Sequence, residues 1–99
     1  MTRDKMLTEL IVELNADPRV NSAVLEYPSF IDVEMMDGSR YHVGTAEPQW
    51  AGDYFSPDNV DGDTDGGFTS EMPSDHYGLD IIGDVLQALF THYESHSGK

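Results

Sequence analysis

The most specific arrangement of chemically active residues in this sequence is a short run of alternating aspartates. Residues 61–66 read Asp-Gly-Asp-Thr-Asp-Gly, so Asp61, Asp63 and Asp65 occupy every second position before a glycine. Carboxylates at this spacing can converge on one hard cation, and the glycine permits the sharp turn that such a loop needs. The sequence therefore makes Ca²⁺ a candidate ligand of these three side chains.

The aspartate run resembles the first half of an EF-hand calcium loop, but its second half departs from that family. The twelfth loop position carries Met72 where the family has a bidentate glutamate, and Glu71 lies one place early. Residues 56–60 do not read as an entering helix. Two interpretations stay open, a solvated Asp-Gly loop and a calcium site that stiffens the loop.

The other patterns that could support catalysis or metal binding are weak. His92 and His96 stand four residues apart, a spacing that can hold zinc, but no glutamate follows the first histidine as in zincins. A position near a helix C-terminus also explains histidines through the helix dipole. The chain has no cysteine, no nucleophile elbow and no glycine-rich phosphate loop. We therefore expect a non-enzymatic protein with no catalytic residues.

The charge of the chain is its strongest global feature. Nineteen acidic residues stand against five basic ones, for a net charge of −14. Such a chain is unsuited to binding nucleic acid directly or to an anionic membrane. Residues 1–44 hold eight acidic and four basic residues, whereas residues 45–99 hold eleven acidic residues and one basic residue. This asymmetry indicates an acidic interaction surface in the second half.

Aspartates of the second half are expected to form that surface, with aromatic residues as anchors. Rows of carboxylates can imitate nucleic-acid phosphates and occupy a groove lined by Arg and Lys. Part of the row is expected on the outer face of the last helix. The candidate partner-binding residues are Asp53, Tyr54, Phe55, Asp58, Asp61, Asp63, Asp65, Asp75, Tyr77, Asp80 and Asp84.

Two amphipathic helices are expected to frame the chain. Apolar residues recur at helical spacing from about Asp4 to Asn15, with Thr2 or Asp4 as the N-cap. A second apolar stripe runs through residues 82–93 and predicts a helix over about 74–95. Gly78 and Gly83 weaken its start, so we expect regular helix only from Asp80.

Three short strands are expected between the helices, over residues 22–27, 30–36 and 39–44. A two-residue turn at Asp37-Gly38 would mix apolar and polar faces. A three-residue turn with a left-handed glycine instead pairs Val33 with Tyr41 and Ile31 with Val43. The second register also sets Glu34 against Arg40 and Asp32 near His42, and we prefer it.

Residues 45–73 are predicted as a long irregular loop, because they are rich in Gly, Asp and Pro. The expected fold class is α+β. An N-terminal helix, a three-stranded antiparallel meander, the long acidic loop and a C-terminal helix packed on one sheet face form a single domain over 1–99. No apolar run could span a bilayer and no secretory signal begins the chain, so we expect a cytoplasmic protein.

In size, charge, lack of cysteine and layout, the chain resembles small acidic inhibitors encoded by phages and mobile elements. These include anti-CRISPR and antirestriction proteins, several of which mimic DNA. The resemblance implies a stoichiometric inhibitor, in the host cytoplasm, that binds a basic nucleic-acid-binding surface of a CRISPR effector or nuclease. Two alternatives are a calcium-stabilised protein-binding module and a salt-adapted, halophilic domain whose charge contacts nothing.

Overall fold

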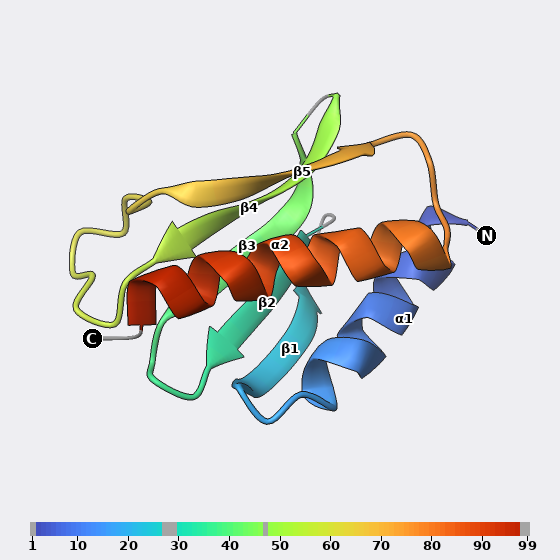
Figure 1. Ribbon diagram of the computed structural model, residues 1–99. Coiled ribbons are helices and arrows are strands. Elements are labelled where there is room, and N and C mark those ends of the chain that lie inside the picture. Colours follow the sequence, from blue (N-terminus) through green and yellow to red (C-terminus); the bar gives the residue numbers. More distant parts are fainter. Residues whose placement is uncertain (1, 27–29, 47, 98–99) are drawn as a thin grey trace.

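The protein has an α+β fold in which a five-stranded antiparallel sheet lies between an N-terminal and a C-terminal helix in sequence (Figure 1). The computed structural model describes residues 2–26, 30–46 and 48–97. The strands follow each other in the sheet in chain order, as a meander. In order, the elements are α1 (Arg3–Asn15), β1 (Val20–Glu26), β2 (Phe30–Met35), β3 (Arg40–Ala46), β4 (Gln49–Phe55), β5 (Gly67–Pro73) and α2 (Leu79–Ser97).

Helix α1 confirms the prediction from apolar spacing to within one residue. Its buried stripe consists of Met6, Leu7, Leu10 and Leu14. The Thr2 hydroxyl accepts the backbone N–H of Lys5 at 3.2 Å and so caps the first turn. At the other end, the Asn15 amide both accepts from Ala23 N–H and donates to Ala23 C=O, which ties the helix to β1.

The β2–β3 hairpin adopts the predicted three-residue turn. Val33 pairs with Tyr41 and Ile31 with Val43, and Gly38 at the turn has φ +93°. The Arg40 guanidinium reaches Asp32 at 3.0 Å, although Glu34 is its direct cross-strand neighbour. The predicted first strand is also present, as β1. Its predicted last residue, Tyr27, and the break at residues 28–29 lie outside the described residues.

The predicted loop over 45–73 was wrong, and so was the number of strands. Strands β4 and β5 fill most of this segment, and only residues 56–66 are irregular between them. The alternation along β4 was hard to recognise because Gly52 stands between buried Trp50 and Tyr54. A Cβ at Gly52 would overlap the Phe68 ring of β5, so the ring fills the place of its side chain.

Helix α2 begins at Leu79, close to the residue where its glycines predicted regular structure to start. It buries Ile81, Ile82, Val85 and Leu89 in the shared core, and Leu86, Phe90 and Tyr93 pack at its margin. Both helices contact the same side of the sheet, α1 at β1 and β2 and α2 at β4 and β5 (Figure 1). Within the described residues, neither helix combines the length and the apolar character needed to cross a membrane.

Two glycine-to-alanine variants should have opposite effects on the free energy of unfolding. At Gly67 a Cβ would overlap the Gly52 carbonyl oxygen, so Gly67→Ala must displace β5 from β4 and should cost about 1–3 kcal/mol. At Gly83 a Cβ meets nothing within 4 Å. Gly83→Ala should therefore stabilise the protein by about 0.5–1 kcal/mol through helix propensity. Urea unfolding followed by circular dichroism measures both, and equal stabilities would contradict the β4–β5 packing.

Candidate functional site

The sheet face opposite the helices is the open face, and a ladder of aromatic rings crosses it. Along β2, β3 and β4 the buried and less buried residues alternate, which places every second side chain on this side. The His42 ring lies between those of Phe30 and Phe55, with a centroid distance of 4.7 Å to each. Three neighbouring strands thus present one continuous row of rings.

Acidic side chains surround this aromatic row, and the arginine beside the row, Arg40, is already paired. Arg40 donates to one oxygen of Asp32, and the other oxygen is buried without a hydrogen bond, 3.8 Å from His42 Nε2. Asp53, next to His42 across β3 and β4, is exposed and makes no ion pair in the described part of the chain. A hollow of about 350 Å³ lies between Phe30, His42 and Asp53. The open face therefore combines aromatic contact area with excess negative charge.

The loop between β4 and β5 adds further exposed carboxylates beside the open face. Asp58, Asp61 and Asp63 are exposed, and their carboxylates make no hydrogen bond or ion pair with any described residue. Asp65 instead turns to its own loop, where it accepts from Asn59 Nδ2 at 2.7 Å and Ser56 N–H at 2.9 Å. The hydrogen bond from Asn59 is the largest cause that lowers the Asp65 pKa. The loop thus has one structural carboxylate and three that are available to a partner.

The structure does not bring the alternating aspartates together around a common point. Across residues 2–26, 30–46 and 48–97, no three or more acidic or histidine side chains are placed to hold a metal ion. Asp65 is already engaged by Ser56 and Asn59. Calcium binding by Asp61, Asp63 and Asp65 stays a prediction.

The other predicted partner-binding residues are dispersed by the strands that the sequence did not reveal. Asp53 and Phe55 lie on the open face, but Tyr54 between them is only 6% exposed and packs on Tyr41 at 5.2 Å. Tyr54 is therefore a core residue, not a surface anchor. The alternation of β4 decides this, because neighbouring side chains of a strand point to opposite faces.

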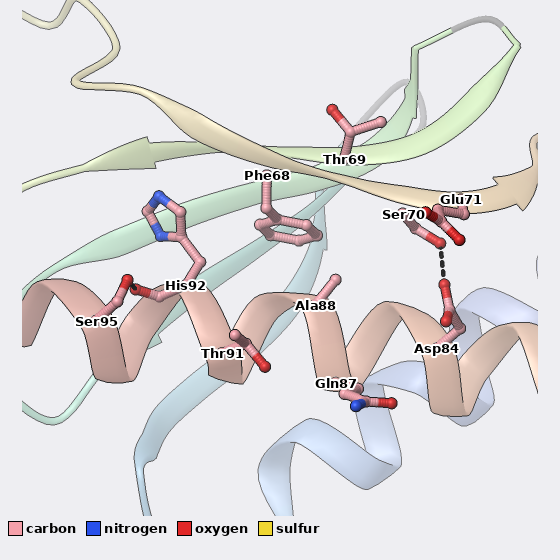
Figure 2. Close-up of a pocket in the computed structure, with 10 residues that line it drawn as sticks. All are labelled: Phe68, Thr69, Ser70, Glu71, Asp84, Gln87, Ala88, Thr91, His92 and Ser95. Atoms are coloured by element: carbon pink, nitrogen blue, oxygen red, sulfur yellow. Dashed lines mark hydrogen bonds between the residues drawn. The ribbon is translucent and has the colours of Figure 1, made fainter.

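The predicted acidic row along the outer face of the last helix also needs correction. Asp84 does not point outward: its carboxylate accepts the hydroxyl of Ser70 on β5 (Figure 2). Asp75, Tyr77 and Asp80 lie around the start of α2 and border a separate hollow. The Tyr77 ring meets the edge of buried Trp50 at 6.3 Å.

Sequence reasoning missed Phe30 and His42 as parts of the candidate site. The predicted hairpin already placed His42 on the polar side of its strand. Because β4 was not predicted, however, nothing placed Phe55 beside His42. The sequence contained the alternation of β2 and β3 but no sign of the third strand that completes the ring ladder.

A partly buried polar contact joins the end of α2 to the sheet. The Tyr41 hydroxyl lies 2.7 Å from His92 Nδ1, and the His96 ring stacks on His92 at 3.9 Å. Burial is the main cause that lowers the pKa of His92, and the neighbouring His96 adds to it. Burial also raises the pKa of the Tyr41 hydroxyl. Both shifts favour the neutral forms, which suits a contact that is partly removed from water.

The lowered pKa of His92 predicts a loss of stability between neutral and mildly acidic pH. Below a pH of about 6.5 the unfolded chain takes up a proton that the folded chain resists. The contribution of neutral His92 is therefore fully present above that pH and is lost as the pH falls through the folded pKa. The urea midpoint should fall between pH 7.5 and pH 5.0. The pKa values of Asp17 and Asp65 are also lowered, but these groups change the stability only at and below their ordinary pKa of 3.8, which is outside this pH range.

The variant His92→Gln removes the titrating group and should flatten this pH dependence. The matched control is His76→Gln, which makes the same substitution at a side chain that is 69% exposed, so a difference between the two variants reports on the position of His92. An undiminished pH dependence in His92→Gln would contradict the assignment to His92.

Comparison of the chain with protein-family models, with curated proteins and with solved structures found no match. The arrangement of side chains described above is therefore the basis of the proposed function.

Proposed function

We propose that this protein is a non-enzymatic acidic inhibitor that binds a basic nucleic-acid-binding surface of another protein and blocks its access to DNA or RNA. A CRISPR effector or a nuclease is the expected kind of target. The observation that carries the proposal is the group of exposed, unpaired carboxylates formed by Asp53, Asp58, Asp61 and Asp63. We call these four residues the acidic surface.

The charge of the acidic surface selects a basic partner. Loop residues 56–66 contain four aspartates and no Lys or Arg. A nucleic acid would be repelled by this surface, whereas an Arg- and Lys-lined groove would be attracted and steered toward it. The exposed carboxylates have no partner among the described residues to give up when they meet a guanidinium or ammonium group. Binding of this kind should be fast and sensitive to salt.

The aromatic row beside the acidic surface adds contact area and stacking to the attraction between opposite charges. An arginine side chain of the partner can stack on the accessible part of a half-buried ring while its guanidinium pairs with a neighbouring carboxylate. Phe55 and His42 border the same hollow as loop residues Asn59 and Gly62. The rings and the loop are thus contiguous, and one partner surface can touch both.

The predicted residues at the start of α2 are not part of this contact. Asp75, Tyr77 and Asp80 border a hollow shared with β5 residues Met72 and Pro73, near the end of β5 that is remote from loop 56–66. They remain available for a larger partner, but the proposal does not depend on them.

The proposal is tested by displacement of labelled DNA from defined basic proteins. A guide-loaded Cas9-type effector and a restriction endonuclease each hold a fluorescein-labelled target duplex, and fluorescence anisotropy follows its release as this protein is added. We expect stoichiometric displacement from at least one of them. The double variant Asp61→Asn/Asp63→Asn should weaken displacement by about tenfold, because each lost exposed pair contributes up to about 1 kcal/mol.

The control is Glu9→Gln/Glu13→Gln, which removes the same charge from α1. If this control weakens displacement equally, net charge and not the acidic surface is responsible. If the duplex is displaced from neither protein, the result contradicts the proposal. Loss of the circular dichroism signal of this protein when KCl is lowered to millimolar concentrations would instead support a salt-adapted domain.

A further inference from the structure

A groove runs between strand β5 and helix α2, on the side of the sheet that carries the helices (Figure 2). Its volume is about 410 Å³. On the helix it is lined by Asp84, Ala88, Thr91 and Ser95, which recur three or four residues apart and so follow one stripe. Phe68 reaches from β5 toward α2 beside Ala88, and Ser70 faces Asp84 (Figure 2). The groove thus has an apolar part and an acidic end.

Among the described strands, β5 lies at one end of the sheet order and pairs with β4 alone, so it forms one edge of the sheet. Along such an edge, alternate backbone N–H and C=O groups face away from the sheet and can pair with another strand. The Ser70 hydroxyl accepts the N–H of Met72 at 3.1 Å, so that amide is already used. Along 67–71, no other strand in the described part of the chain covers this edge, which lies directly beside the groove.

We propose that this groove binds an extended peptide with a basic side chain, which adds to β5 as a sixth strand. Strand addition supplies the backbone hydrogen bonds, and alternate side chains of the peptide enter the groove toward α2. The site lies on another part of the molecule from the acidic surface, so the inference goes beyond the proposed function and does not depend on it.

The basic side chain is selected by Asp84 and Glu71. Ser70 is only 1% exposed, and its hydroxyl fixes the position of the Asp84 carboxylate. A carboxylate that accepts one hydrogen bond still has lone pairs for a guanidinium or ammonium group. Glu71 borders the same groove, and no Lys or Arg is among the described residues that line it. A cation is therefore the matching chemistry at this end.

The spacing within the groove predicts where the peptide carries its apolar residue. Asp84 and Ala88 are separated by four residues of helix, about 6 Å along the axis. Side chains on one face of a strand are about 6.6 Å apart. A peptide whose basic residue meets Asp84 therefore places the residue two positions away over Phe68 and Ala88. A branched apolar side chain, such as valine, suits that position.

A second copy of this chain is the less suitable occupant. Strand β1 or β5 of the second copy would have to supply the added strand, and residues 20–26 and 67–73 contain no Lys or Arg. Two chains of charge −14 would also repel each other. Charge complementarity thus favours a basic peptide from a different molecule.

The test is a titration of the ¹⁵N-labelled protein with the peptide acetyl-TVTRVT-amide, followed by NMR. We expect shift changes at Thr69 and Glu71 of β5 and at Gln87 and Thr91 of α2, with slowed hydrogen exchange along β5. Replacing the arginine of the peptide by glutamate should abolish binding. N-methylation at alternate peptide residues should abolish it too, because methylated amides cannot donate to β5.

Two protein variants separate the site from general electrostatics. Asp84→Asn keeps an acceptor for Ser70 but removes the charge, and should weaken peptide binding by about tenfold. Asp80→Asn makes the same change one turn away and should have no effect. The proposal is overturned if 2 mM peptide causes no shifts, or if the shifts are confined to the open face. It is also overturned if the methylated peptide binds as well as the unmethylated one, or if the two protein variants lose equal affinity. The DNA-displacement test uses loop variants, so the two failures are distinguishable.

Discussion

Burial of a single sheet face is the constraint on which the rest of this structure depends. A chain of this length supplies two helices, and both are used on one side of the five strands. Strands β2, β3 and β4 therefore alternate between buried residues on the covered face and less buried residues on the open face. This alternation places Trp50 and Tyr54 in the core and Asp53 and Phe55 outside. The chemistry of the open face is a consequence of what the covered face requires.

The helices and the first hairpin could be predicted because their local patterns agree with their long-range packing. The apolar spacing of α1 is visible within one segment, and the turn at Gly38 follows from matching two adjacent faces. β4 and β5 could not be found in the same way. Their inward positions include Gly52 and Ser70, which read as loop residues. Gly52 belongs to the core because Phe68, sixteen residues later, occupies the space of its side chain.

The candidate site was predictable only where exposure follows from local sequence. Asp58, Asp61 and Asp63 lie in a true loop and are exposed, as the excess of acidic residues suggested. Tyr54 and Asp84 were assigned to the surface, and the structure places them against Tyr41 and Ser70. Their positions depend on contacts between segments far apart in the chain, about which local composition carries no information.

The open edge of β5 gives the net charge a consequence for the solubility of the fold. Unpaired strand edges are templates on which identical molecules can join into extended ribbons. At β1 the Asn15 amide already pairs with the Ala23 backbone, whereas β5 has no edge lysine of the kind that often prevents such association. Repulsion between copies of charge −14 can keep the edges apart instead, over a screening length of about 8 Å at physiological ionic strength. In about 1 M salt that length shrinks to about 3 Å, and self-assembly through these edges becomes the dominant hazard for the protein in solution.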